Sequence, residues 1–419
     1  MIDLTSLPNP QRRALDIVKE VAAEKNCRPF LVGGPVRDLL LGRQVIDIDV
    51  TLEDGASTLA RSLARAISGR VRSFPQFLTY KVTADGLPEI DIATARKEKY
   101  RQPGALPSVT AGKLKDDLVR RDFSINALAL DLTNGALHDP THGERDLHDH
   151  VIRVLHDASF ADDPTRIFRA VRLAARLNFT LDPHTDALLR TAVAAGALGH
   201  ISRERVWREV FLAFDEAEAP RIVQSLHDLG ALDILFGARP NDPELRRRLE
   251  AVRRQADADP QLDREVMFTA ALLHGNASPL DLEGSGFSQK RTRNVVQIAN
   301  ELPRFREGLS EARDDRQRFS LLRNASAEAL SVLAASAPDE QANIARFTEY
   351  ERFRLPLRGN DLEVPPGPHV AQALERTREA VFSGEIEASD ARAFARRVAM
   401  EYLQKDEGGR MTDVGQPAL

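Results

Sequence analysis

Two aspartates one residue apart, Asp47 and Asp49, lie in a short apolar stretch that predicts a β-strand over 45–50. Side chains two positions apart on a strand share a face, so both carboxylates should point the same way. Like charges held together repel unless a cation lies between them, and Mg²⁺ prefers oxygen ligands from carboxylates and substrate phosphates. The pair therefore predicts a magnesium site, although the same pattern also occurs on solvated edge strands.

A glycine pair and an arginine come shortly before these aspartates. Gly33 and Gly34 end the apolar run FLV, and Arg37 lies in the short helix expected next. Glycine allows a sharp turn and lets main-chain N–H groups come close to a ligand. Either feature alone is commonly only structural, but joined within about twenty residues they favour a metal and nucleotide site.

Asp91 is a third carboxylate, in the apolar segment PEIDIA. It could be a third metal ligand, or it could support the two other aspartates without contacting the metal. It could equally be a salt-bridge partner at the end of a strand.

The segment DDLVRRDFSINALAL (116–130) carries two adjacent arginines, Arg120 and Arg121, that could bind a triphosphate. Asp122 and Asn126 are four residues apart and would be neighbours on a helix, where they could bind ribose hydroxyls. The alternative is a capped amphipathic helix with solvated charges.

A helix is predicted over 164–178, capped by Asp163. A carboxylate accepts from an exocyclic amine, and a guanidinium donates to a neighbouring ring acceptor. Cytosine and adenine present an amine beside such an acceptor, whereas guanine and uracil present the reverse. Asp163 with Arg166 could therefore select C and A without a nucleic-acid template. Arg169 and Arg172 would position phosphates or hold this pair, unless the basic face is only solvated.

Mixed strands and helices up to about residue 155 predict one compact α/β domain, and helical periodicity dominates after it. The segment 99–113 holds two prolines and two glycines and predicts a loop. A hairpin turn and a short helix are expected over 138–153. The other expected strands are 70–74, 77–84 and 88–95, and the other expected helices are 10–26, 57–68, 183–195, 203–217, 219–230, 243–255, 264–274, 288–301, 311–321, 325–336, 338–350, 368–382 and 389–404.

Composition limits the class of protein. A chain of 419 residues suggests several domains, and a single cysteine, Cys27, argues against a disulfide framework and for the cytoplasm. No apolar run is long enough to span a membrane, and no secretory signal is evident. A net charge of −5 neither indicates nor excludes nucleic-acid binding, because local patches decide it.

Taken together, the motifs resemble those of the class II tRNA nucleotidyltransferases, the CCA-adding enzymes with their A-adding, CC-adding and bacterial poly(A)-adding relatives. GGPVRD with DID is similar to the first family motif, and RRDFSINALAL to the second. DPTHGERDLHDHVIR, DDPTRIFRAVRLAARLNF and ISRERVWREVFLAF resemble the third, fourth and fifth, in the family's order. The segment LRGNDLEVPPGPHVAQALERTREAVFSGEI resembles the tail of bacterial CCA- and A-adding enzymes.

The resemblance implies an α+β fold, with an N-terminal mixed-sheet nucleotidyltransferase head followed by an all-helical neck, body and tail. The boundaries we expect are 1–155 for the head, 156–217 for the neck, 218–310 for the body and 311–407 for the tail that binds tRNA. A disordered C-terminus is expected over 408–419.

The resemblance also assigns residues. Asp47 and Asp49 match the pair that binds two Mg²⁺ ions, Asp163 and Arg166 match the base-reading pair, and one of Arg120 and Arg121 matches a triphosphate contact. Asp162 stands where the family usually has a glutamate. The full set of expected catalytic residues is Asp47, Asp49 and Asp91, and the expected nucleotide-binding residues are Gly33, Gly34, Arg37, Arg120, Arg121, Asp122, Asn126, Asp163, Arg166, Arg169 and Arg172.

The implied activity is template-independent addition of C and A, from CTP and ATP, to the 3′ end of tRNA, by a chain expected to be a monomer. The alternatives are an A-adding or CC-adding enzyme, a poly(A) polymerase, a small-molecule nucleotidyltransferase and a non-catalytic tRNA-binding protein on the same scaffold. The segment 99–113 lies where the family has a flexible loop that helps the change from C to A addition. Its presence argues against CC addition alone.

Overall fold

The structure is a computed structural model that describes residues 4, 7–237 and 242–411 of the chain. It divides into two compact units, Met1–Arg246 with Leu280–Ser288, and Arg247–Pro279 with Gln289–Leu419. The boundary falls inside the segment predicted as the body. The finer division into neck, body and tail therefore stays a prediction.

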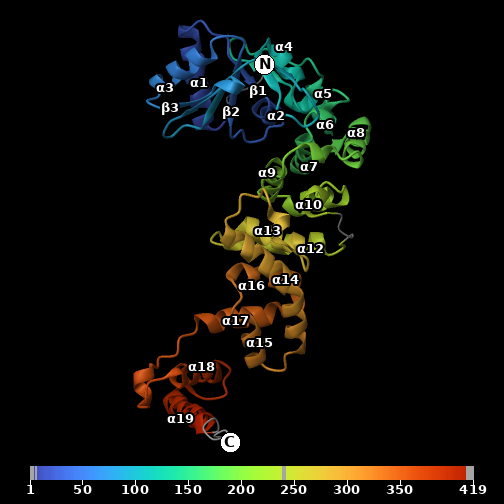
Figure 1. Cartoon of the computed structure of the whole chain (residues 1–419). Coiled ribbons are helices and arrows are strands. Elements are labelled where there is room, and N and C mark those ends of the chain that lie inside the picture. The colour runs from blue at the N-terminus through green and yellow to red at the C-terminus, as the bar shows by residue number, and fades with distance from the viewer. Residues whose placement is uncertain (1–3, 5–6, 238–241, 412–419) are drawn as a thin grey trace, which may run out of the picture. The chain divides into compact units, whose positions relative to one another are not determined.

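A seven-stranded mixed sheet forms the centre of the first unit (Figure 1), in the order β3-β4-β5-β2-β1-β8-β9. Only β2 and β5 run parallel within it, and their register places Asp49 directly beside Asp91. The predicted strand over 45–50 begins later, at Ile48, so Asp47 precedes it. The strands are β1 (Phe30–Val32), β2 (Ile48–Leu52), β3 (Arg70–Phe74), β4 (Thr79–Thr83), β5 (Ile90–Thr94), β8 (Ala129–Asp131) and β9 (Leu137–His138).

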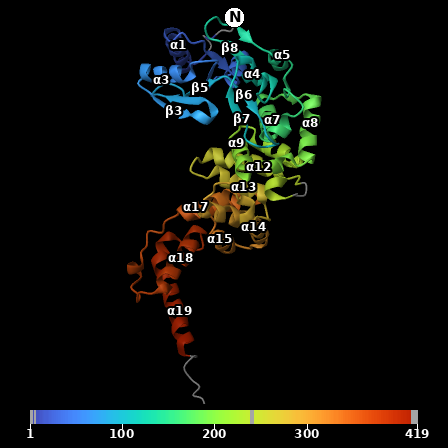
Figure 2. The ribbon, with the colours of Figure 1, turned by 45° about the horizontal axis from the view of Figure 1, so that its top comes forward.

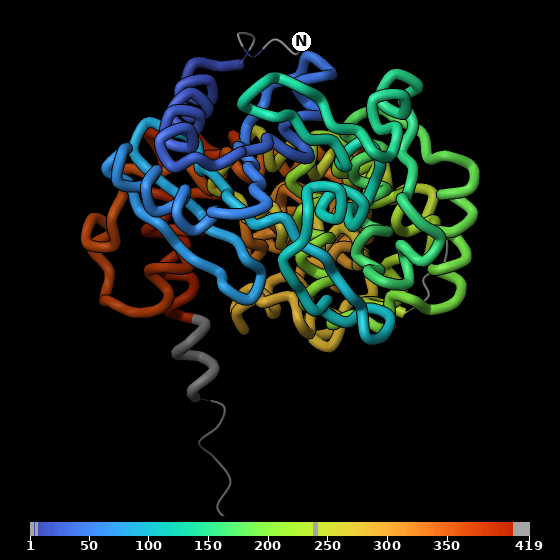
Figure 3. The backbone as a smooth tube through the Cα atoms, turned by 90° about the horizontal axis from the view of Figure 1, so that it is seen from above, coloured from blue at the N-terminus to red at the C-terminus, as the bar shows by residue number. Residues whose placement is uncertain are grey.

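Helices α1 (Asn9–Glu24) and α3 (Ala56–Ala66) pack against each other, and α3 also packs against β3, β4 and β5. Both helices bury one apolar stripe, which in α3 includes Leu59 and Leu63 at the spacing of one helical turn. In Figure 3 the blue backbone can be followed from the N-terminal helix into the sheet. Helix α3 therefore covers one face of the sheet over β3, β4 and β5.

The segment predicted as a loop over 99–113 is a loop over 100–107 but also contains the second strand of a β-hairpin. Strand β6 (Arg96–Lys99) pairs antiparallel with β7 (Ser108–Ala111), and Figure 2 shows the two side by side. The prolines that suggested a loop lie only in the turn between the two strands. The prediction was wrong at 108–111, because strand pairing with β6 outweighed the local turn propensity.

The helical part of the first unit begins with α6 (Ser159–Asp162) and α7 (Thr165–Leu177), and α7 packs against α9 (Arg203–Phe214) and α10 (Ala219–Asp228). Trp207 of α9 is fully buried, and its ring packs against Phe211, Phe236 and Phe287. This aromatic core braces α9 against its neighbours. The remaining short elements are α2 (Gly34–Leu40), α4 (Leu114–Val119), α5 (Gly143–His148), β10 (Val151–Ile152), β11 (Thr180–Leu181), α8 (Pro183–Ala194) and α11 (Asp233–Phe236).

The second unit is helical, as predicted. Phe319, Phe347, Tyr350 and Phe382 pack into one aromatic cluster within it. Among the described residues of the chain, no helix combines the length and the apolarity needed to cross a membrane. The helices of the second unit are α12 (Leu245–Ala258), which starts at the boundary, α13 (Arg264–Leu273), α14 (Gln289–Glu311), α15 (Asp315–Leu322), α16 (Ala327–Ser336), α17 (Gln341–Arg352), α18 (Pro368–Phe382) and α19 (Ala391–Met411).

Two predicted helix ends in this unit were wrong. The helix predicted over 288–301 continues past Pro303 to Glu311, because its apolar stripe carries on to Leu309. Helix α19 extends to Met411, so the first four positions of the tail predicted as disordered, 408–411, are helical. The rest of that tail, 412–419, lies outside the described residues.

Candidate active site

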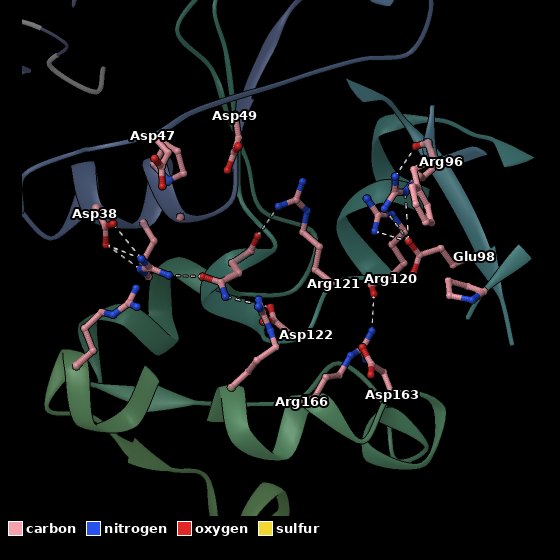
Figure 4. Close-up of a pocket in the computed structure, with 18 of the residues that line it drawn as sticks. Asp38, Asp47, Asp49, Arg96, Glu98, Arg120, Arg121, Asp122, Asp163 and Arg166 are labelled. Atoms are coloured by element: carbon pink, nitrogen blue, oxygen red, sulfur yellow. Dashed lines mark hydrogen bonds and ion pairs between the residues drawn. The ribbon is translucent and has the colours of Figure 1, made fainter. Parts of the chain in front are cut away.

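One cavity of about 700 Å³ in the first unit gathers most of the predicted site residues (Figure 4). It is lined from α2, from the start of β2, from the segment after α4, from the β6–β7 hairpin and from α7 and α9. All of the predicted residues except Gly33, Asp91 and Arg172 line it. Chain segments far apart in sequence therefore meet at one polar site.

Asp47 and Asp49 both line this cavity. Burial raises the pKa of Asp49 to about 6, with smaller contributions from the charges of Asp91 and Asp47 and an opposing one from Arg121. Among the described residues, no group of three or more His, Cys, Asp or Glu side chains is arranged to hold a metal ion. Two carboxylates fit Mg²⁺ nevertheless, because this ion usually takes one or two protein carboxylates and completes its shell with phosphate and water oxygens.

Asp91 lies beside Asp49 across the β2–β5 pair, but it does not line the main cavity. Its carboxylate lies 3.7 Å from the Lys81 ammonium, which also pairs with Glu89. Burial, as the largest cause, raises the pKa of Asp91. This contact is the salt bridge that the sequence left open as an alternative, and a role for Asp91 in metal binding stays a prediction.

The turn before α2 needs glycine at its first position. Gly33 has a φ of +74°, and a Cβ atom there would lie 2.5 Å from Nη1 of Arg121. In the next turn, Arg37 is buried, pairs with Asp38 and donates from Nη1 to Oδ1 of Asn126 at 2.7 Å. The glycine turn thus makes room for an arginine from a distant segment of the chain.

The helix expected to carry Asp122 and Asn126 is absent at this place, where residues 124–126 form a single 3₁₀ turn. The two side chains still meet, because Asn126 donates from Nδ2 to Oδ1 of Asp122 at 3.0 Å. Arg169 donates from Nε to the other oxygen, Oδ2, at 2.9 Å. Burial favours the neutral acid, but the charge of Arg169 and these hydrogen bonds hold the pKa of Asp122 well below its usual range.

The predicted base-reading residues, Asp163 and Arg166, are each held by other groups. Oδ1 of Asp163 accepts from the Thr165 hydroxyl at 2.7 Å and from Nη2 of Arg205 at 2.8 Å. Its second oxygen, Oδ2, accepts no hydrogen bond from the described residues. Arg166 is only 4% exposed and donates to the Ser159 hydroxyl at 2.6 Å and to the Arg120 carbonyl at 2.9 Å.

Arg172 does not reach the cavity, contrary to expectation. It donates from Nη1 to Glu209 at 2.6 Å and lies 3.6 Å from Glu216. Both partners lie on or just after α9, so the arginine joins α7 to α9. Its place is that of a structural ion pair and does not support a nucleotide contact.

Several residues of the cavity were missed from the sequence. Glu98 and Tyr100 of the hairpin line it, as does Arg205 of α9. Arg205 also donates from Nη1 to the Gly104 carbonyl at 2.8 Å, which ties the hairpin turn to Asp163. The signal that could have found Arg205 was its place in a family-like motif, and the hairpin residues had no such signal.

A mixed sheet with paired carboxylates beside a cavity lined by arginines has the groups that a nucleotidyltransferase needs. The comparisons agree, since residues 29–153 match the "Poly A polymerase head domain" model and residues 178–247 the "Probable RNA and SrmB- binding site of polymerase A" model. The A-adding tRNA nucleotidyltransferase of Halalkalibacterium halodurans is 32% identical over 94% of this chain and 95% of its own length. This chain therefore belongs to the class II tRNA nucleotidyltransferase family, which confirms the resemblance and the enzyme class.

Solved structures confirm the α+β fold. A CCA-adding enzyme without ligand matches with a TM-score of 0.81 and 26% identity, over 96% of this chain and 97% of its own. The Thermotoga maritima CCA-adding enzyme complexed with tRNA matches with a TM-score of 0.78 and 25% identity, over 93% and 95%. The chain spans only 28% and 46% of the A-adding enzymes of Aquifex aeolicus and Geobacter sulfurreducens.

We expect Asp122→Asn to destabilise the first unit by about 1.5–3 kcal/mol at neutral pH, since it weakens charged hydrogen bonds to a buried carboxylate. The pKa of Asp122 is depressed by folding, so its contribution is fully present above the usual value of 3.8 and is lost progressively as pH falls from there toward the lower pKa of the folded state. Thermal unfolding from pH 7 down to pH 3 should show the gap to wild type narrowing below about pH 4. The control is Asp186→Asn, which breaks an exposed pair with Arg190. A gap that stays constant with pH would contradict the assignment.

Gly33→Ala should weaken nucleotide binding, because the new methyl group would displace the Arg121 guanidinium. The matched control is Gly42→Ala, which has a similar φ of +64° but no atom within 4 Å of the added Cβ. Both variants place alanine at a positive φ. Titration with ATP should therefore separate the two, and equal affinities would count against Arg121 as a nucleotide contact.

Proposed function

We propose that this protein adds C and A residues to the 3′ end of tRNA, using CTP and ATP and releasing pyrophosphate, without a nucleic-acid template. The observation that carries the proposal is one cavity in which the paired carboxylates, the arginines and the Asp163–Arg166 pair meet. The first two groups supply phosphoryl-transfer chemistry, and the third supplies a choice of base. A small-molecule nucleotidyltransferase would have no need for the helical second unit.

In the proposed reaction the terminal 3′-hydroxyl of the acceptor attacks the α-phosphate in line, and pyrophosphate leaves. Asp47 and Asp49 would hold two Mg²⁺ ions, which lower the pKa of the hydroxyl and neutralise charge on the leaving oxygens. Arg37 and Arg121 line the same cavity and would place the triphosphate. The contribution of the protein is then mainly position and charge.

Base choice follows from the free oxygen of Asp163. Thr165 and Arg205 hold Oδ1 of this carboxylate, so Oδ2 is left to accept an exocyclic amine. Ser159 and the Arg120 carbonyl hold the Arg166 guanidinium near it. The pair can read N4–H₂ and N3 of cytosine, or N6–H₂ and N1 of adenine, and it disfavours guanine and uracil.

An A-adding enzyme is the second candidate, and one observation favours it. Over nearly the full chain, identity is 32% to an A-adding enzyme and 26% to a CCA-adding structure. The difference is small, and no residue of the cavity explains a restriction to ATP. The intact Asp47–Asp49 pair argues against a non-catalytic tRNA-binding protein.

The proposed partners are tRNA, CTP and ATP, with the helical second unit contacting the tRNA. We also propose that the protein is a monomer. We propose a cytoplasmic location, which the single cysteine supports.

The activity is tested with purified full-length protein, labelled CTP or ATP, and tRNAs that lack all, two or one of the terminal CCA nucleotides. Incorporation of C on the shortest and of A on the longest is expected, and A alone would identify an A-adding enzyme. Asp47→Ala should abolish incorporation while leaving tRNA binding intact. The exposed Asp85→Ala is the control. Normal turnover by Asp47→Ala would rule out the proposed mechanism.

Arg166→Ala should relax base choice, because the donor to the ring acceptor is lost while the phosphate contacts stay. The ratio of kcat/KM for CTP over UTP should fall by roughly 10-fold to 200-fold, as for the loss of about 1.5–3 kcal/mol from a charged hydrogen bond. Arg172→Ala, on the same helix but outside the cavity, should keep the ratio. An unchanged ratio in Arg166→Ala would refute base reading by this residue.

A further inference from the structure

Asp117 of α4 is a fully buried carboxylate close to the cavity. Its Oδ1 accepts from Nη2 of Arg120 at 2.7 Å, and its Oδ2 accepts from Nη2 of Arg121 at 3.0 Å. Burial favours the neutral acid, but the charges of Arg121 and Arg120 keep the pKa of Asp117 below its usual value. One buried charge therefore holds two arginines, one on each oxygen.

All three guanidinium nitrogens of Arg120 donate to protein carboxylates. Its Nε and Nη2 donate to Asp117, and its Nη1 donates to Glu98 of the hairpin at 2.7 Å. Glu98 is itself nearly buried and also pairs with Arg96 at 3.1 Å. The carbonyl of Arg120 accepts from Arg166. Arg120 thus links the hairpin, α4 and α7, and three of its five N–H groups are engaged by protein carboxylates.

Arg121 differs in the donors that it keeps. Its Nη1 has only a long contact of 3.5 Å, to the Asn126 carbonyl, and its Nε is buried with no hydrogen-bond partner. Figure 4 shows the guanidinium extending toward Asp49, and its charge acts on that carboxylate. It also lies against Gly33, where the main chain approaches the cavity. Arg121 therefore keeps more free N–H donors than Arg120, and its charge acts on Asp49 of the proposed metal site.

We propose that Asp117 is a positioning residue for the triphosphate, which fixes Arg120 as a strut and presents Arg121 as the arginine that contacts phosphate. The proposal rests on the proposed function and deepens it, because the sequence leaves open which arginine binds. Within this cluster Glu98 and Asp117 hold the guanidinium groups of Arg96, Arg120 and Arg121, and the charge of Arg121 also acts on Asp49. A guanidinium already held in place loses less conformational freedom when the phosphate arrives.

A purely structural ion cluster would give a different result in a binding experiment. If Asp117 only stabilised the hairpin and α4, its loss would lower the thermal midpoint and leave the affinity for phosphates unchanged. If it positions Arg121, its loss should weaken triphosphate binding whatever base is attached. Inorganic tripolyphosphate tests this directly, because it carries no base and no ribose.

The experiment measures the Kd of full-length protein for ATP and for inorganic tripolyphosphate, with Mg²⁺ and without tRNA. Asp117→Asn should weaken both by the same factor, roughly 10-fold to 100-fold, the usual cost of losing a group that orients a ligand-binding residue. The matched control is Asp116→Asn. Asp116 points elsewhere, accepting from the Lys113 backbone N–H at 2.8 Å, so both Kd values should stay at the wild-type level.

An unchanged Kd for tripolyphosphate in folded Asp117→Asn would overturn the proposal, as would a loss for ATP alone. If Asp117→Asn does not fold, Glu98→Gln decides, because it removes the other anchor of Arg120 and should also weaken tripolyphosphate binding. Unchanged binding in Glu98→Gln would then overturn it. Wild-type protein that binds ATP but extends no tRNA would contradict the proposed function. The tripolyphosphate measurements would then still test the role of Asp117.

Discussion

The first unit depends on buried carboxylates, which hold arginine side chains at the edge of the main cavity. A buried carboxylate is costly unless an opposite charge and hydrogen bonds replace water. For Asp122 these come from Arg169, 47 positions away, and for Asp117 they come from Arg120 and Arg121, three and four positions away. The Asp122 pair joins the segment after α4 to α7, the Asp117 pairs stay within α4 and the residues that follow it, and both place arginines at the cavity.

The opposite problem is found at Asp47 and Asp49, whose negative charges lie together, and the opposing charges of Arg121 and Lys81 do not offset the effect of burial on Asp49. The raised pKa of Asp49 reflects this, since burial disfavours its charge and nearby carboxylates add to the effect. A site with acids on one side and arginines on the other suits a metal-bound triphosphate, whose ions and phosphates carry the complementary charges. The fold of the family thus places acids and arginines where the proposed nucleotidyl transfer needs them.

Much of the architecture could be predicted from local patterns. Helix α7 was expected because Asp163 and Pro164 precede an apolar stripe, and β3 was expected with the bounds it has. Failures came where tertiary contacts decide the local state. The turn-rich segment 99–113 pairs as a hairpin, Asp122 and Asn126 meet across a 3₁₀ turn, and Arg172 faces α9 instead of the cavity.

The sequence by itself determined the chemistry available to this protein, since paired aspartates, a glycine turn and an Asp–Arg pair are readable from residue type and spacing. Only the tertiary structure decided which of these groups are free to act. Arg120 and Arg121 are adjacent and chemically identical, yet Glu98, 22 positions earlier, occupies the first and leaves donors on the second. Spacing along a chain specifies what can be neighbours within one element, whereas the partners of a buried charge come from whichever elements pack around it.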